Sequence, residues 1–247
     1  MKIAVIGNSH IGALKRGWDG GVSKEYLGVS LTFFGARNSA ISALSVNAGR
    51  LIPETSELAQ SFAVTSGGQR EVNAAEYDVF LAYGMCRELR GQVENHAGSF
   101  SSAALTQASL DYWASYNLLK TLDKIKQATE RPLFAGHAPL AAAQKAEDLT
   151  QDDYHTFLAA AQRLVFDLIP AKLIGQPGAT LLDGGATRAE FSKGSERLAV
   201  GKPDDNSPHI ATEVNHMNAA YGALWLRAFL SRVAQTKKAA PNETAFS

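Results

Sequence analysis

The chain has 247 residues, 45% of them hydrophobic and 19% charged, a composition typical of a globular protein with a sizeable core. Its 24 basic and 24 acidic residues give a formal net charge of zero, which argues against nucleic acid or an anionic membrane as a partner. The single cysteine, Cys86, excludes an internal disulfide and a cysteine-based metal cluster.

The sequence shows no targeting signal. The apolar run near Met1 ends at Gly7, which is too short for the hydrophobic region of a signal peptide. No later segment is apolar over the length that a membrane span needs. We therefore expect a cytoplasmic protein with no nucleic-acid or membrane partner, and the sequence leaves its oligomeric state open.

Apolar runs and helical periodicities alternate along the chain. We expect strands at residues 2–6, 29–35, 78–83, 132–136 and 179–184, each ended by a glycine. We expect helices at residues 11–19, 102–127, 152–168 and 217–234. Residues 44–75 and 183–208 are rich in turn-forming residues and are predicted to be loop insertions.

Strands that alternate with helices are typical of a doubly wound α/β fold. We predict one domain over residues 1–235, a three-layer α/β/α sandwich with a mostly parallel central sheet. Residues 236–247 are polar and are predicted to form a flexible tail.

The first predicted strand leads into a small polar turn, in "KIAVIGNSHIGAL". A dinucleotide-binding turn needs G-x-G-x-x-G, but Ser9 stands where the second glycine belongs. Gly7 and Gly12 have the spacing of a P-loop, but Ala13 replaces the lysine that holds the phosphates. Neither nucleotide-binding interpretation fits this turn.

Ser9 is instead a candidate nucleophile. A serine after the first strand of an open parallel sheet lies at the crevice where such folds bind ligands, and backbone N–H groups at the following helix start favour an oxyanion. A serine hydroxyl needs a base. His216, in "EVNHMNAAYG", precedes a predicted helix, and Glu213 three residues earlier is placed to orient its ring. The alternative is that Ser9 only caps the first helix.

Four blocks of sequence, in order from residue 3 to 222, together resemble the SGNH (GDSL-like) hydrolase superfamily. "IGNSH" resembles the block that carries the catalytic serine, here Ser9, and "FFGA" the block whose glycine, here Gly35, joins the oxyanion hole. "YDVFLAYGMC" resembles the strand followed by G-x-N, and "EVNHMNAAYG" the D-x-x-H block that carries the base, His216. The resemblance implies the flavodoxin-like fold of that superfamily.

The chain departs from the family pattern at two positions. Gly84 is present in the third block, but Cys86 replaces the asparagine that donates to the oxyanion, and a thiol is a weak donor. Arg87 is a candidate replacement. In the last block Glu213 replaces aspartate, so Asp204, Asp205 or backbone carbonyls remain alternative orienting groups.

Several further side chains are candidates for the site. The expected oxyanion and substrate-binding residues are Asn8, His10, Gly35, Gly84, Cys86, Arg87 and His137. His209 is expected to be a loop residue, and Cys86 an inert thiol more than a nucleophile. His209, His216, Asp204, Asp205 and Glu213 lack a metal-binding spacing, so we expect no metal, and nothing indicates a cofactor.

The sequence thus predicts a serine ester hydrolase. The family resemblance implies a small acyl ester as substrate, commonly an acetyl group on a carbohydrate. Two alternatives stay open: an O-acyltransferase that uses the same Ser–His pair, and a catalytically silent module that binds a glycan or a partner.

Overall fold

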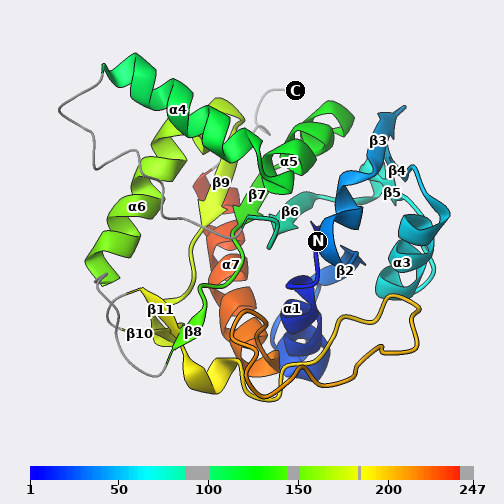
Figure 1. Cartoon of the computed structure of the whole chain (residues 1–247). Coiled ribbons are helices and arrows are strands. Elements are labelled where there is room, and N and C mark those ends of the chain that lie inside the picture. The colour runs from blue at the N-terminus through cyan, green and yellow to red at the C-terminus, as the bar shows by residue number, and fades with distance from the viewer. Residues whose placement is uncertain (87–100, 144–150, 183–184, 240–247) are drawn as a thin grey trace.

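A five-stranded parallel sheet forms the centre of the computed structural model, which describes residues 1–86, 101–143, 151–182 and 185–239 (Figure 1). Its strand order is β2-β1-β6-β7-β9. The strands are β2 (Ser30–Gly35), β1 (Lys2–Gly7), β6 (Val79–Tyr83), β7 (Leu133–Gly136) and β9 (Ala171–Ile174). All four pairings are parallel, which confirms the predicted α/β class. This order is the flavodoxin-like one, which reverses direction between β1 and β6.

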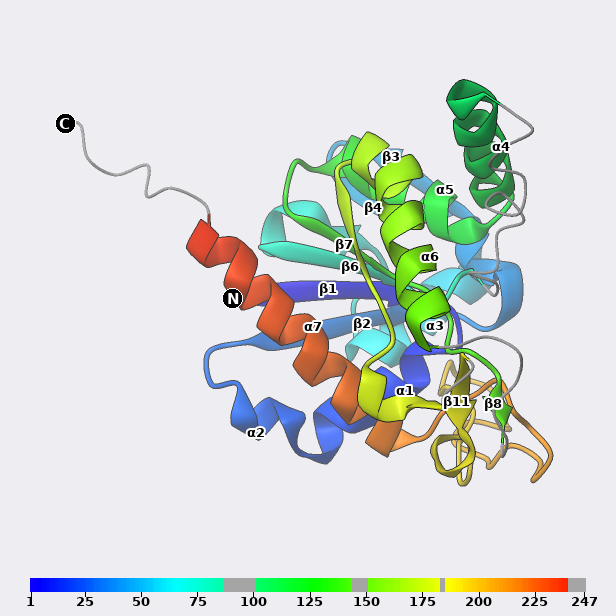
Figure 2. The same ribbon diagram turned by 90° about the vertical axis from the view of Figure 1, so that its left-hand side faces the viewer.

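Helices cover both faces of the sheet, so the structure has the predicted three layers (Figures 1 and 2). One face carries α3 (Ser56–Ser66), α4 (Ser102–Ala114), α5 (Asn117–Ala128) and α6 (Gln151–Leu164). The other carries α1 (Ile11–Gly17) and α7 (Ala219–Ala239). The short π-helical turn η1 (Trp18–Val22) and α2 (Ser23–Glu25) follow α1 and lead to β2. No helix in the described part of the chain is long and apolar enough to cross a membrane.

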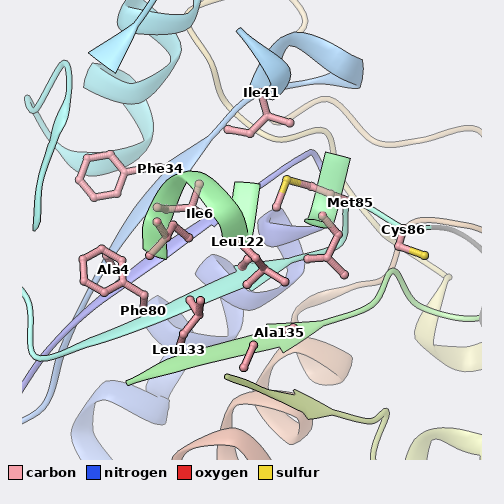
Figure 3. Packing of buried hydrophobic residues seen from close by; sticks show 14 of the residues in the cluster. Ala4, Ile6, Phe34, Ile41, Phe80, Met85, Cys86, Leu122, Leu133 and Ala135 are labelled. Carbon is pink, nitrogen blue, oxygen red and sulfur yellow. The ribbon is translucent and has the colours of Figure 1, made fainter. Parts of the chain in front are cut away.

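The central strands form because both of their faces are buried. In β1, Ala4 and Ile6 point into the core under α3 and α5, whereas Ile3 and Val5 point toward α1 and α7. A strand buried on both faces is a continuous apolar run, unlike the alternating pattern of a strand with one solvated face. Figure 3 shows side chains of the first of these cores, including Phe80 of β6 and Leu122 of α5. Phe34 of β2 packs edge-on against Phe62 of α3.

The fifth strand of the central sheet is not the one expected at residues 179–184. Residues 181–182 of that run belong to a small separate sheet of β8 (Ala142–Ala143), β10 (Leu181–Leu182) and β11 (Ala186–Arg188). The fifth strand of the central sheet is β9, a short edge strand. The Gln162 side chain covers its outer edge, accepting from the Leu173 N–H (2.7 Å) and donating to the Ala171 carbonyl (2.9 Å). A side chain that occupies backbone groups in this way protects an edge strand from pairing with another chain.

Two further expectations were wrong. Residues 44–75 are not a loop insertion, because they form β3 (Leu44–Asn47), β4 (Arg50–Pro53), α3 and β5 (Val72–Asn73). The single helix expected at 102–127 is divided into α4 and α5 at Ser115. The Ser115 hydroxyl donates to the Tyr112 carbonyl at 2.6 Å, a local bond that competes with helix continuation.

The carboxyl end of the chain forms more helix than expected. Helix α7 continues to Ala239, so residues 236–239 of the expected tail are helical. Residues 240–247 lie outside the described part of the chain. Short 3₁₀ turns complete the fold at η2 (Asn38–Ser42), η3 (Ala74–Glu76), η5 (Phe166–Leu168), η6 (Gly178–Thr180) and η7 (Ala189–Phe191).

Helices α1 and α7 pack backbone against backbone. A Cβ atom added at Gly222 would overlap the Ala13 carbonyl, and one added at Gly17 would overlap the backbone of Gly222 and Ala223. Only glycine at both positions allows the two helices to approach this closely. The contact sets the distance between the segments that precede α1 and α7.

We expect Gly222→Ala to lower the free energy of unfolding by about 2 kcal/mol or more, because the new methyl group must push the helices apart. Urea denaturation monitored by circular dichroism measures the change. Gly20→Ala is the matched control, since nothing lies within 4 Å of a Cβ there. Equal stability of Gly222→Ala and the wild-type protein would show that the two backbones are not in contact.

Candidate active site

Ser9 lies in the turn between β1 and α1, at the point where the strand order reverses. The turn is held by backbone bonds from Ile11 N–H to Asn8 O and from Gly12 N–H to Ser9 O, both 3.1 Å. Gly84 follows β6 next to this turn. Its φ of +82° favours glycine, and a Cβ there would lie 2.7 Å from Asn8 Oδ1 and from His10 Cβ. Gly84 therefore allows the two strand ends to meet.

The Ser9 hydroxyl is paired with the predicted base. Ser9 Oγ lies 2.9 Å from His216 Nε2, a hydrogen-bond distance between residues 207 positions apart. The alternative that Ser9 caps the first helix does not describe this structure, because the N-cap of α1 is His10 and makes no side-chain cap bond. The hydroxyl is directed across to the segment before α7.

Glu213 is the carboxylate nearest the other ring nitrogen of His216. Glu213 Oε1 lies 3.6 Å from His216 Nδ1, an ion-pair distance longer than a hydrogen bond. The same oxygen accepts the Asn215 N–H at 2.6 Å. Burial raises the pKa of Glu213, but the Asn215 N–H and the nearby His216 outweigh burial, so this pKa lies below its usual value. Glu213 is thus ionised at neutral pH.

The alternative orienting residues, Asp204 and Asp205, are engaged elsewhere. Arg37 binds Asp204 at 2.6 Å and Asp205 at 2.8 Å, and it also donates to the Leu198 carbonyl. Asp205 accepts three further backbone N–H groups, from residues 200–202. These bonds fold a loop and do not orient His216.

The segment of residues 192–218, whose path is drawn in Figure 1, is called here the arm, and it is bound to α1 and to Arg37 after β2. Arg16 of α1 binds Glu196 at 3.0 Å and the Arg197 carbonyl at 2.6 Å, and Arg37 binds the arm as described. Leu198 is buried in the core beside α1. Since the arm carries Glu213 and His216, these contacts hold both residues in place.

Two more imidazole rings flank His216. The His10 ring is stacked on it with a centroid distance of 4.9 Å and an interplanar angle of 21°. The His209 ring is stacked on it at 4.2 Å and 25°. His209 lies in a loop, as expected, and its ring is also part of the candidate site. Among the described residues, no group of three or more His, Cys, Asp or Glu side chains could hold a metal ion.

The backbone N–H groups of Gly35 and Gly84, both expected near the oxyanion, donate hydrogen bonds within the protein. The Gly35 N–H donates to Thr65 Oγ1 at 3.0 Å, and the Ser61 hydroxyl donates to the Gly35 carbonyl at 2.8 Å. The Gly84 N–H donates to the Gly136 carbonyl at 2.9 Å. In this state Gly35 serves the docking of α3 on β2, which corrects its expected role as an oxyanion donor.

The third sequence block also contributes Cys86 and Arg87 to the expected site. Cys86 is buried in the core on the α3 and α5 side of the sheet (Figure 3). A thiol placed in an apolar core is not set up as a nucleophile. Arg87, the candidate replacement donor, lies outside the described residues.

His137 does not line an open pocket, because it is buried in a polar network. Its Nδ1 bonds to the Ala138 carbonyl and its Nε2 lies 2.6 Å from the Tyr154 hydroxyl. The Tyr154 oxygen also accepts the Gln176 N–H, so Nδ1 carries the ring proton and Nε2 accepts from Tyr154. The network ties the loop after β7 to α6 and to the end of β9.

The residues that sequence reasoning missed are His209, Ser195 and Thr65. Ser195 Oγ lies 3.1 Å from His209 Nδ1 and Thr65 occupies the Gly35 N–H. None of them belongs to a motif. The only signal was the crowding of histidines and carboxylates between residues 204 and 216.

No model of a known protein family matches the sequence, and no curated protein matches it. The structure is similar to the periplasmic domain of a lipopolysaccharide acetyltransferase from Salmonella ser. Paratyphi A, at 12% identity and a TM-score of 0.46, over 94% of this chain and 83% of that one. It is also similar to a carbohydrate acetylesterase family member from Sinorhizobium meliloti, at 9% identity and a TM-score of 0.38, over 95% of this chain and 98% of that one.

The buried His137 predicts a loss of stability in acid. Burial lowers the pKa of His137 from 6.5 to about 4. Below pH 6.5, His137 is protonated in the unfolded chain but stays neutral in the folded one. The free energy of unfolding therefore falls as the pH is lowered, until the pH reaches about 4. The shift corresponds to a loss on the order of 3 kcal/mol.

Urea denaturation between pH 7 and pH 4 measures this loss. We expect His137→Asn to be less stable than the wild-type protein at pH 7 but to lose less stability on acidification. His155→Asn, at an exposed position of α6, is the control and keeps the wild-type pH dependence. An unchanged pH slope in His137→Asn would contradict the assignment.

Proposed function

We propose that the protein is a serine ester hydrolase of the SGNH type, with Ser9 as nucleophile and His216 as base. The observation that carries the proposal is the 2.9 Å contact between Ser9 Oγ and His216 Nε2. A hydroxyl within hydrogen-bond reach of a histidine, itself near a carboxylate, is the arrangement of an activated nucleophile. The ordered sequence blocks support the same class.

The proposed reaction has two halves. Ser9 Oγ attacks the ester carbonyl as its proton passes to His216 Nε2, and the resulting imidazolium then protonates the leaving alkoxide. Water attacks the acyl-serine in the second half, with His216 first taking and then returning a proton. The ionised Glu213 stabilises the imidazolium and favours the tautomer with the proton on Nδ1.

The oxyanion hole of this proposal differs from that of the family. Because Thr65 holds the Gly35 N–H, the donor proposed from the described residues is the Ser9 N–H at the start of the α1 turn. A further donor is proposed near Cys86, with Arg87 as the candidate. Loss of one oxyanion donor costs roughly 10²–10³ in rate, so we expect slow turnover of unactivated esters.

The proposed substrate is a small acyl ester, such as an O-acetyl group on a carbohydrate, as the family resemblance implies. Transfer to a sugar hydroxyl uses the same Ser–His pair and differs only in which acceptor reaches the acyl-serine. The geometry of the pair supports both reactions, and the product formed distinguishes them.

Hydrolysis of a short-chain chromogenic ester at neutral pH tests the proposal. We expect Ser9→Ala and His216→Ala each to lower kcat/KM by about 10² or more, because each removes part of the nucleophile–base pair. His155→Ala, at an exposed histidine far along the chain, is the matched control and retains wild-type turnover.

The same assay with an added acceptor sugar identifies the reaction. Free acid as the sole acyl product supports hydrolysis, and an acylated sugar formed only with intact Ser9 supports transfer. Wild-type turnover by Ser9→Ala would refute the nucleophile assignment. Glycan binding that survives Ser9→Ala, in a wild-type protein that cleaves no ester, would favour the silent module.

A further inference from the structure

The His216 ring lies between two other imidazole rings. His10 stacks at 4.9 Å and 21°, and His209 stacks at 4.2 Å and 25°, so both flanking rings are nearly parallel to His216. The three rings come from two parts of the chain: His10 follows Ser9 directly, whereas His209 and His216 belong to the arm. Their stack joins the α1 turn to the arm at the proposed reacting atoms.

The His209 ring is itself held by Ser195. Its Nδ1 lies 3.1 Å from Ser195 Oγ, and its backbone N–H donates to the Ser195 carbonyl at 2.9 Å. Ser195 is buried, and the backbone around it is fastened by the Arg16 bonds to Glu196 and Arg197. The position of His209 is therefore set by the anchoring of the arm to α1.

The proposed chemistry requires a fixed plane for the His216 ring. Its Nε2 has to face Ser9 Oγ, and rotation of the ring about the Cβ–Cγ bond would carry Nε2 away. The Glu213 oxygen, at 3.6 Å, is beyond hydrogen-bond distance and constrains the ring angle only weakly. Rings stacked on both faces oppose that rotation directly.

We propose that His209 is a positioning residue for His216, whose stacked ring fixes the plane of the base so that Nε2 faces Ser9. This inference rests on the proposed function of the same site. His209 touches no reacting atom and acts through His216 alone. The family resemblance carried no residue to this position.

The ionisation of His209 fits this role. Burial, followed by the charge of the neighbouring His216, lowers the pKa of His209 to about 4. Arg197 and Arg16 act in the same direction, whereas Glu213 acts against them. The stacked ring is thus neutral at neutral pH and does not repel the imidazolium that forms on His216.

The test compares His209→Ala, which removes the ring, with His209→Phe, which keeps an aromatic face but loses the bond to Ser195. We expect His209→Ala to lower kcat about 10-fold to 100-fold with little change in KM, since the base is misplaced and substrate contacts remain. His209→Phe should recover most of that loss. His155→Ala again serves as the control, and urea denaturation establishes that each variant is folded.

A second readout is independent of turnover. Nitrogen-15 NMR of the imidazole groups reports the tautomer of His216, and the wild-type protein is expected to show a single neutral form with the proton on Nδ1. His209→Ala should give averaged nitrogen shifts at His216, and His209→Phe should restore the single form.

The two readouts separate the positioning role from the proposed function. A wild-type protein that cleaves no ester, but whose His216 signals become averaged in His209→Ala, would refute the esterase proposal and support positioning. Unchanged His216 signals in a folded His209→Ala would overturn positioning, whatever the activity. A His209→Phe variant as impaired as His209→Ala would also overturn it, because the ring would then not be the effective group.

Discussion

The close backbone packing of α1 on α7 is the contact on which the candidate site depends. Ser9 lies two residues before the start of α1, and His216 lies three residues before the start of α7. Gly17 and Gly222 let the two helices touch without intervening side chains. Ser9 and His216 therefore meet because the helices that follow them meet, and this approach depends on the absence of side chains at Gly17 and Gly222.

The contacts of the arm with the core further restrict the position of the turn that carries His216. Arg16 and Arg37, from α1 and the end of β2, bind carboxylates and carbonyls along residues 196–205. Both arginines bind carbonyl oxygens as well as carboxylates, which fixes backbone and side chain together. The turn that carries His209, Glu213 and His216 continues from this anchored stretch, and the Val214 carbonyl is bound by the Ala142 N–H of β8.

Much of this architecture was predictable because it rests on local patterns. The runs that became β1, β6 and β7 are almost entirely apolar and end at a glycine, which is the pattern of buried parallel strands, and the second half of β2 shares it. The run at β9 has the same form, "AKLIG", but it is short and carries the exposed Lys172, so "ATLLDG" was the stronger apolar signal. The break at Ser115 depends on one hydroxyl bond that periodicity does not show.

The pairing of Ser9 with His216 was predictable from chemistry, since a serine nucleophile needs a base. The stack of His209 on His216 was not, because it depends on the path of the arm and hence on long-range arginine contacts. The engagement of Gly35 was also not predictable. It arises because Ser61 of α3 binds the Gly35 carbonyl and Thr65 of α3 binds the Gly35 N–H. These two hydrogen bonds hold α3 against β2.

The separation of 207 positions between Ser9 and His216 has a consequence for how the site comes into being. Ser9 leaves the ribosome 207 residues before His216. A nascent chain that has not yet reached residue 216 lacks the imidazole that bonds to the Ser9 hydroxyl. Contacts this distant in sequence require a large loop to close, so the Ser9–His216 pair forms only once α7 has packed on α1.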